Sequence, residues 1–244
     1  MWAVVFFYWY RDNPRDNPRL NSAERALLPD ADEVTLSEGR VPWAKFLRSG
    51  QVWLLCAQYF CLAYGWYFYI TWLPTYLREG RGLEMGRSAW LSILPLGLGG
   101  LGSLFCGFAS ARVTRWTGSV KTTRRIMAVT GFTGASLLLA LSTWLQDPLW
   151  AMLVIGFASF SNDLVMPGSW GACMDMGGKY AGTLSGAMNM CGNLGGAVSP
   201  IMIGYLLTWT GKNWDVTFYV SAAAYFMGAF CWLFLDPVTP VEQE

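Results

Sequence analysis

Six long apolar runs constrain the fold of this chain more than any other feature. Crossing the roughly 30 Å hydrocarbon core of a bilayer takes about 20 helical residues at about 1.5 Å each. Runs of that length cover residues 52–76, 89–110, 126–145, 149–172, 181–208 and 215–235. Hydrophobic residues make up 54% of the chain and charged residues 14%, which is too apolar for an ordinary soluble domain. The sequence therefore predicts an all-α membrane protein with six transmembrane helices in a lipid bilayer.

The part of the chain before the first run reads as two pieces. Residues 2–10 are apolar and aromatic but too short to span, and they lack the features of a signal peptide, so we interpret 1–10 as the end of a truncated transmembrane helix. Residues 11–50 carry seven basic side chains and two Asp-Asn-Pro triplets, which predicts a polar linker with a short surface helix near 22–28. The expected bundle then covers 51–236, and 237–244 form a tail.

The distribution of Lys and Arg predicts the orientation, because loops on the cytoplasmic side of a membrane carry an excess of both. One set of alternating loops holds thirteen of them and the other set holds four: Arg78, Arg81, Arg87 and Lys212. We therefore expect the linker, the loop at 111–125 and the C-terminal tail to be cytoplasmic, in a multi-pass protein of the cell membrane.

Composition excludes several classes of function. A net charge of +1 gives no basic surface for nucleic acid. Histidine is absent, which removes the usual general base and the usual zinc ligand. The six cysteines lie in or beside apolar segments without a CxxC pattern, so they read as packing residues. We expect no enzymatic activity, no metal and no cofactor.

Asp163 is the clearest ionisable residue at membrane depth. Placing a carboxylate there costs about 2.5–3.5 kcal/mol on insertion scales, so the side chain should face protein or a water-filled cavity. One interpretation is a proton or cation site. The other is a carboxylate satisfied by Asn162, Ser159 or a neighbouring helix.

Asn189 and Asn193 are four residues apart and share a helix face with Ser185, at about the depth of Asp163. This polar stripe lies on a glycine-rich segment that favours close helix packing, with a moving gate as the alternative. The stripe suits either substrate binding or hydrogen bonding between helices.

Several phrases, in order, resemble the anion:cation symporter family of the major facilitator superfamily. They are Tyr10-Arg11-Asp12-Asn13-Pro14 with Ala23-Glu24-Arg25, the segment from Gly65 to Tyr76 (GWYFYITWLPTY), and the segment from Ser185 to Gly196 (SGAMNMCGNLGG). The resemblance implies twelve spans in two six-helix bundles, of which this chain holds the C-terminal bundle. It implies a missing N-terminal half, which in relatives carries the substrate-binding arginine.

The resemblance also implies site residues. Asn189 matches the family's substrate-contacting asparagine, while Asn193 rests on geometry alone. Ser169 and Trp170 resemble a hydroxyl and tryptophan pair that touches a sugar acid, although Trp170 also suits an interface anchor. Gln58 matches a Gln-Tyr position and Tyr69 ends a Trp-x-Phe-Tyr segment. We assign Tyr59, Tyr64 and Tyr67 to packing or to the aromatic belt.

The loop after the second run resembles the superfamily's cytoplasmic gating motif. Gly107, Arg112, Arg115 and Gly118 match its glycines and arginines, and Ala111 stands where the motif has aspartate. The charge pairing that latches one conformation in relatives is therefore incomplete in this chain.

The resulting interpretation is the C-terminal half of a secondary transporter for small organic anions such as sugar acids, coupled to a proton or a sodium ion. A transport-inactive membrane fragment and a half-transporter that self-associates are the alternatives. Intramembrane hydrolysis is disfavoured because Asp163 has no second membrane aspartate.

Overall fold

A computed structural model describes residues 2–11, 16–26 and 41–243, which divide into two units, one within 1–41 and one within 42–244. The first unit contains α1 (Trp2–Trp9) and α2 (Ser22–Ala26). A reciprocal pair of hydrogen bonds starts α2: the Glu24 amide donates to Asn21 Oδ1 at 2.8 Å, and the Asn21 amide donates to Glu24 Oε2 at 3.1 Å. The rest of the helix expected near 22–28 lies outside the described residues.

The second unit is a bundle of long helices. In chain order these are α4 (Trp43–Arg48), α5 (Gly50–Thr71), α6 (Leu73–Thr75), the short turn η2 (Tyr76–Gly80), α7 (Met85–Thr117), α8 (Val120–Ser142), α9 (Pro148–Asp163), α10 (Met166–Gly177), the turn η3 (Gly178–Tyr180), α11 (Ala181–Trp209), α12 (Trp214–Phe234) and the turn η4 (Val241–Gln243). Taking α9 and α10 together, residues 42–243 contain six long helical passes at the positions that the apolar runs predict.

Capping residues explain several helix ends. Ser49, Ser119, Asp147 and Asn213 each precede a helix and accept a hydrogen bond from a backbone amide in its first turn. Gly118 ends α7 with φ at 65°, a left-handed conformation that glycine adopts without steric cost. Local sequence therefore explains where four of the helices begin and where α7 ends.

The fourth pass differs from the single helix expected over 149–172. It is broken at Leu164 and Val165 into α9 and α10. Pro167 stands in the first turn of α10, where its missing amide hydrogen is tolerated, whereas inside a continuous helix it would remove a hydrogen bond. The break places Asp163 at the last position of α9 instead of in the middle of a helix.

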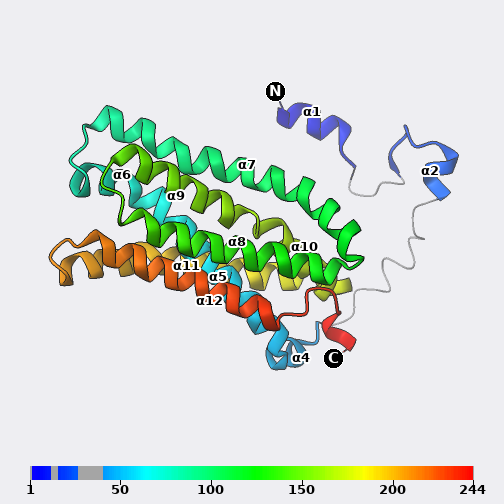
Figure 1. Cartoon of the computed structure of the whole chain (residues 1–244). Coiled ribbons are helices and arrows are strands. Elements are labelled where there is room, and N and C mark those ends of the chain that lie inside the picture. Colours follow the sequence, from blue (N-terminus) through cyan, green and yellow to red (C-terminus); the bar gives the residue numbers. More distant parts are fainter. Residues whose placement is uncertain (1, 12–15, 27–40, 244) are drawn as a thin grey trace. The chain divides into compact units, whose positions relative to one another are not determined.

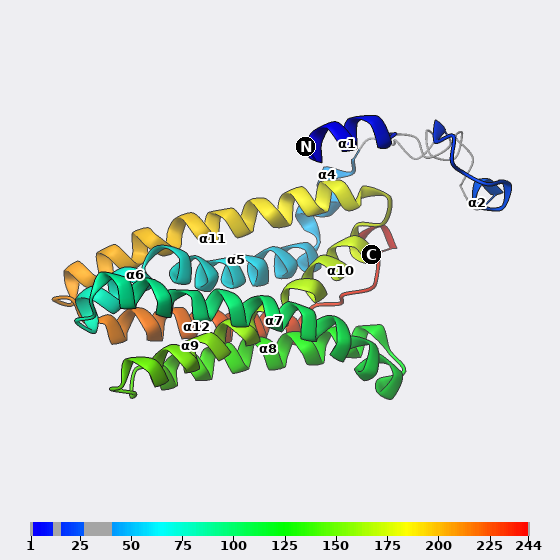
Figure 2. The ribbon, with the colours of Figure 1, turned by 90° about the horizontal axis from the view of Figure 1, so that it is seen from above.

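Most of the closest helix pairs in the bundle join helices that are not consecutive in the chain, although α8 and α9 are. α5 packs against α11 and α12, α8 against α9 and α12, and α7 against α9 (Figure 1). Figure 2 shows α11 and α5 side by side, and the chain turning at η3 between α10 and α11. The largest fully buried side chains, Trp232, Tyr225, Phe68, Phe132 and Phe218, form the core between these helices.

Four stretches of the described chain are long and apolar enough to cross a membrane: Met85–Thr117, Val120–Ser142, Pro148–Trp209 and Trp214–Phe234. The third stretch contains the turn at η3, so it makes two passes. α5 falls outside this set because Gln51, Gln58 and its many Tyr and Trp residues lower its hydropathy. The fold is that of an all-α membrane protein.

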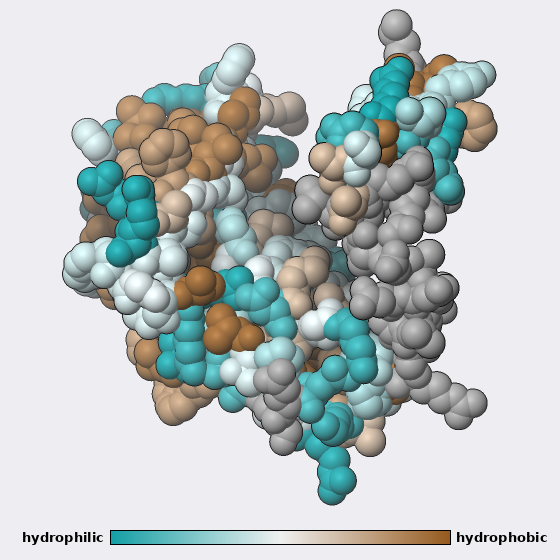
Figure 3. All heavy atoms as spheres, turned by 90° about the vertical axis from the view of Figure 1, so that its right-hand side faces the viewer, coloured by the Kyte–Doolittle hydropathy of each residue, from teal (hydrophilic) through white to brown (hydrophobic). Residues whose placement is uncertain are grey.

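Basic side chains gather at one end of the bundle, where α5, α8 and α11 begin and where α7, α10 and α12 end. Figure 3 looks onto this end and shows hydrophilic side chains collected there. Eight Lys and Arg residues of unit 2 belong to it, namely Lys45, Arg48, Arg112, Arg115, Lys121, Arg124, Arg125 and Lys179, against four at the opposite end. This asymmetry has the sense expected for a cytoplasmic end.

Candidate functional site

A pocket of about 290 Å³ lies between α5, α9 and α11, with one residue from the start of α10. Its lining combines amide, carboxylate and phenol groups with apolar walls: Tyr59, Leu62, Ala63, Trp66, Tyr67, Asn162, Asp163, Met166, Asn189, Gly192 and Asn193. Mostly apolar pockets with a few convergent polar groups are typical of small-molecule sites. Three of the residues predicted from sequence, Asp163, Asn189 and Asn193, meet here.

Asp163 and Asn162 form the acidic part of the pocket. Asn162 donates from Nδ2 to Asp163 Oδ1 at 2.8 Å. The other carboxylate oxygen, Oδ2, lies against α7, where a side-chain carbon added to Gly99 would be 2.6 Å from it. Asn162 is fully buried, and its Oδ1 has no hydrogen-bond partner in the described part of the chain. A pocket-lining residue therefore carries a buried acceptor atom that is unsatisfied within the described residues, which is uncommon in folded proteins.

Asn189 and Asn193 contribute the amides of α11. Asn193 donates from Nδ2 to the carbonyl oxygen of Asn189 at 2.9 Å, which fixes its rotamer. The Asn189 side chain lines the pocket and makes no hydrogen bond within the described residues. Ser185, predicted on the same stripe, instead contacts Cys173 Sγ of α10 at 3.5 Å.

Tyr59 is held in the pocket wall by two neighbouring helices. Trp170 of α10 donates from Nε1 to the Tyr59 hydroxyl at 3.1 Å, and the two rings pack edge to face at 5.9 Å. On the other side, a side-chain carbon added to Gly192 of α11 would be 2.6 Å from Tyr59 Cδ1. Trp170 does not line the pocket, so within this structure it positions Tyr59.

Gln58, Ser169 and Tyr69 lie in the interior and do not line the pocket. Gln58 Oε1 accepts hydrogen bonds from Ser169 Oγ and from Trp232 Nε1, both at 3.0 Å. Its Nε2 donates to the Leu55 carbonyl at 3.0 Å, so every polar atom of this amide is engaged. Tyr69 contacts the Tyr225 hydroxyl at 3.5 Å. The structure does not bring these three residues to the candidate site.

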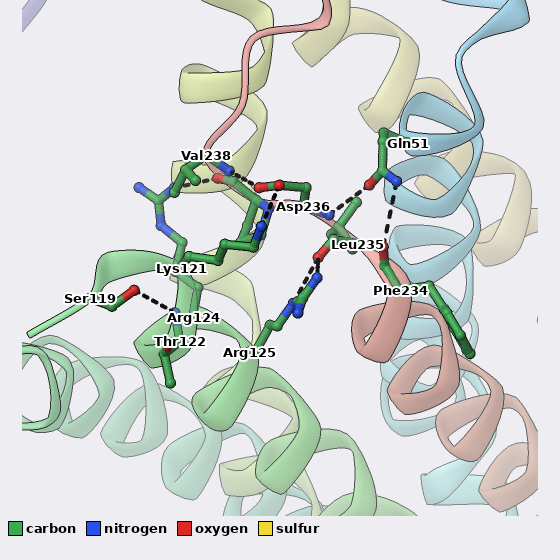
Figure 4. A network of polar contacts seen from close by, with 11 residues as sticks. Gln51, Ser119, Lys121, Thr122, Arg124, Arg125, Phe234, Leu235, Asp236 and Val238 are labelled. Atoms are coloured by element: carbon green, nitrogen blue, oxygen red, sulfur yellow. Dashed lines mark hydrogen bonds and ion pairs between the residues drawn. The ribbon is translucent and has the colours of Figure 1, made fainter. Parts of the chain in front are cut away.

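The gating-motif residues Gly107, Arg112 and Arg115 lie on the last turns of α7, exposed to the surroundings of the bundle. Neither arginine makes a hydrogen bond or an ion pair within the described residues. The contacts at this end come instead from the first turns of α8, where Lys121, Arg124 and Arg125 face the chain that leaves α12 (Figure 4). In the sequence these three were read only as a signal of orientation.

Arg125 caps the end of α12, donating from Nε and Nη2 to the Leu235 carbonyl at 2.9 and 2.7 Å. A guanidinium is favourable there because helix C-termini expose unpaired carbonyls and a partial negative charge. Arg124 donates to Asp175 Oδ2 at 2.7 Å and to the Pro237 carbonyl at 2.6 Å. Together they connect α8 to α10 and to the tail.

Lys121 forms an ion pair with Asp236. Burial is the largest single effect on this carboxyl and opposes its ionisation. The hydrogen bond and charge of Lys121, with hydrogen bonds from the Val238 amide and Thr239, together outweigh burial and lower the pKa of Asp236 below its ordinary value. The amide of Asp236 also donates to Gln51 Oε1 at 2.6 Å, which brings in α5 (Figure 4). We call this set, Lys121, Arg124, Arg125, Asp175 and Asp236, the tail network.

The described residues contain no group of three or more His, Cys, Asp or Glu side chains that would hold a metal ion. Sequence reasoning also missed several pocket residues. Tyr59 and Tyr67 had been assigned to packing or to the aromatic belt, and Asn162 had been weighed only as a partner of Asp163. A helical wheel shows which residues share a face, but it does not show which neighbouring helix that face meets.

Long apolar helices around a small, mostly apolar pocket with a few convergent polar groups are the architecture expected of a helical membrane transporter. Residues 1–200 match the family model described as Major Facilitator Superfamily, and the chain belongs to that superfamily. The sequence-based prediction of this family is confirmed, and the class is one of transporters and not of enzymes.

The relatives are anion transporters. The chain is 30% identical over 244 residues to the probable sulfoacetate transporter SauU of Cupriavidus necator, covering 99% of this chain and 56% of that protein. It is 27% identical to the chloroplastic ascorbate transporter of Arabidopsis thaliana, over 95% of this chain and 42% of that one. It is 25% identical to the chloroplastic sodium-dependent phosphate transport protein 1 of Arabidopsis thaliana, covering 95% of this chain and 45% of that protein. The chain thus spans about half the length of the curated relatives it matches.

Proposed function

We propose that this chain is the C-terminal bundle of a secondary transporter that moves a small organic anion by alternating access. The observation that carries the proposal is the pocket between α5, α9 and α11, with the free amide of Asn189 in its wall. In transporters built from repeated bundles, the substrate site lies near the middle of the membrane between the repeats. In this proposal all six passes, α5 included, cross the membrane, and the basic end faces the cytoplasm of a cell membrane.

The lining indicates which part of the substrate the bundle would hold. Amide and phenol groups bind hydroxyl and carboxylate oxygens, and no Lys or Arg lines the pocket. The cation that neutralises the anion would therefore come from the other half of the transporter. A sugar acid fits this division, because its hydroxyls suit Asn189 and Asn193 while its carboxylate points to the missing half.

Coupling is proposed at Asp163. A carboxylate beside an anionic substrate repels it unless a proton or a sodium ion neutralises the charge. The unpartnered Oδ1 of Asn162 next to Asp163 provides a second oxygen for either one. In this proposal Asp163 is loaded before or together with the anion.

Two alternatives follow from the coverage of about half of each relative. Two copies of the chain could pair, each bundle serving as the other's partner, or the chain could be an inactive membrane fragment. Crosslinking in the membrane separates these, because dimers are expected only in the first case.

The experiment is a ligand-dependent thermal shift of the 244-residue chain in nanodiscs, with sulfoacetate, ascorbate, phosphate and a panel of sugar acids. A ligand that binds only the folded state raises its stability by mass action. We expect a shift for one anion that Asn189→Ala weakens by about 1 kcal/mol, or roughly fivefold in Kd, through the lost hydrogen bond. Thr208→Ala, on the same helix but outside the pocket, is the matched control and should bind normally.

Coupling is tested in the same assay by varying sodium concentration and pH. If Asp163 carries the coupling ion, the parent's ligand affinity depends on one of the two and Asp163→Asn loses that dependence. An affinity that depends on neither, or a dependence that persists in Asp163→Asn, would remove Asp163 from the mechanism. No shift for any ligand would favour the inactive fragment.

A further inference from the structure

The short helix α4 has one apolar face and one basic face. By helical periodicity Trp43, Phe46 and Leu47 share one face, and Ala44 and Arg48 share the opposite one. Trp43 and Leu47 are 56% and 61% exposed although both are large and apolar. Short segments of this kind, next to a transmembrane helix and carrying Trp and basic residues, lie in the membrane interface.

α4 is nevertheless fixed to the bundle. Phe46 is buried and packs edge to face on Tyr180 with ring centroids 6.1 Å apart. Trp53 of α5 donates from Nε1 to the Leu47 carbonyl at 2.9 Å, and Lys45 Nζ donates to the Glu242 carbonyl at 3.0 Å. These contacts hold α4 in place, so the shape of the cavity between α4 and the bundle is defined by the fold.

That space is an apolar slot of about 140 Å³ between α4, α5 and α11. Its walls include Leu47, Trp53, Ala187 and Met190. A dry apolar cavity of about 150 Å³ accepts a benzene-sized hydrocarbon, so the slot has room for part of an acyl chain. In a bilayer the hydrocarbon available to fill it is lipid.

Basic groups lie on the other face of the same helix. Lys45 and Arg48 line a second hollow of about 370 Å³ that extends to Gly50 and Val241. Arg48 makes no ion pair within the described residues, and the nearest acidic tail residue, Glu242, already pairs with Lys179 at 3.0 Å. The positive charge of this hollow is therefore available to an anionic headgroup.

We propose that α4 and the adjoining ends of α5 and α11 form a binding site for an anionic phospholipid. One acyl chain occupies the slot, and Lys45 and Arg48 bind the headgroup phosphate. Gln51, about one helix turn after Arg48, accepts a hydrogen bond from the Asp236 amide of the tail network and donates one to the Phe234 carbonyl. An occupied lipid site would therefore stabilise the cytoplasmic end of the bundle.

Phosphatidylglycerol and phosphatidylcholine with identical acyl chains are the probes, added to the detergent-purified 244-residue chain and read by native mass spectrometry and thermal shift. We expect retention of phosphatidylglycerol over phosphatidylcholine. Basic residues near an anionic surface contribute on the order of fivefold each, so Lys45→Gln with Arg48→Gln should weaken retention on the order of 30-fold. Arg112→Gln with Arg115→Gln removes the same charge at the same end and should leave retention unchanged.

The slot is tested separately from the charge. Ala187→Phe fills it from α11, and Leu47→Asn makes its wall polar at an exposed position that the fold tolerates. Both should reduce phosphatidylglycerol retention while keeping Lys45 and Arg48 intact. Equal loss in the Arg112 and Arg115 control, normal retention in both slot variants, or equal retention of the two lipids would each overturn the proposal.

Discussion

Individual polar side chains inside the bundle fall into two groups. Gln58 and Ser169 make their hydrogen bonds with neighbouring helices, whereas Asn162 Oδ1 and the amide of Asn189 keep unpaired atoms at the pocket. From the sequence the two groups look the same, because each is a polar residue on an apolar helix. Only the partner helix decides whether such a residue holds the bundle together or faces a ligand.

Gln58→Ala should lower stability without acting on the pocket. Ser169 Oγ can still donate to the Val165 carbonyl at 3.2 Å, but the buried Trp232 Nε1 loses its acceptor, which costs about 1–3 kcal/mol. Thermal unfolding in nanodiscs measures the loss, and Gln146→Ala, at an exposed loop position, is the control. Unchanged stability with abolished ligand binding would instead support the substrate contact expected from the sequence.

For whole helices, the sequence predicts the capped ends well and the interruptions inside a helix poorly. Caps at Ser49, Ser119, Asp147 and Asn213 mark the beginnings of four helices. The break between α9 and α10 was missed because an apolar run gives no sign of an interruption, and a proline in a membrane helix is compatible with a kink as well as with a break. Glycines reveal helix contacts only after the neighbour is known.

Two glycines of α11 differ in whether a neighbouring helix packs against them, so their substitution distinguishes the effect of helix packing from that of helix propensity. A side-chain carbon at Gly195 would overlap the Phe60 carbonyl of α5, while one at Gly186 meets nothing within 4 Å. Gly195→Ala should therefore cost about 1–3 kcal/mol by forcing the helices apart. Gly186→Ala should be neutral or stabilise by about 0.5–1 kcal/mol. Thermal unfolding of the two variants decides, and equal effects would contradict close packing of α5 and α11.

The tail network should make stability depend on pH. Because the pKa of Asp236 is lowered in the folded state, its ion pair stabilises the fold above the ordinary carboxyl range near 3.9 and is lost as pH falls through the lowered value. Asp236→Asn should be less stable than the parent by up to about 1 kcal/mol at pH 7 and equal to it in strong acid.

Unfolding measured at several pH values tests this, with the exposed Glu84→Gln as the control. A constant difference between Asp236→Asn and the parent down to pH 2 would show that the ion pair contributes nothing that titrates.

The architecture of the whole molecule was predicted from the sequence more completely than its helices or its individual residues. The positions of the six long helical segments, the all-α class and the superfamily follow from apolar runs and a few ordered phrases, because the bilayer allows few alternatives to helices. The pocket was predicted in part: three of its residues were named, while Gln58, Tyr69, Ser169 and Trp170 lie outside its lining. The tail network was not predicted, since half of the bonds described for it go to backbone carbonyls, which carry no sequence signal.

Orientation is testable on the whole molecule. Ala111 and Gln146 are exposed and lie at opposite ends of the bundle. In the proposed orientation the basic end faces the cytoplasm. In intact cells a membrane-impermeant maleimide should then label Gln146→Cys, and Ala111→Cys only after permeabilisation. The parent chain, whose described cysteines are buried or half-buried, gives the background. The reverse pattern of labelling would contradict the proposed orientation.

The length of α7 has a practical consequence. Its 33 residues extend about 50 Å, whereas a bilayer with its headgroups is about 40–45 Å thick. Unless α7 tilts strongly, it extends beyond the headgroups, and its exposed last turns, with Arg112, Arg115 and Trp116, are placed to stand in solvent. A small membrane protein usually offers electron microscopy few landmarks, and this protrusion is where a nanobody would be raised to provide one.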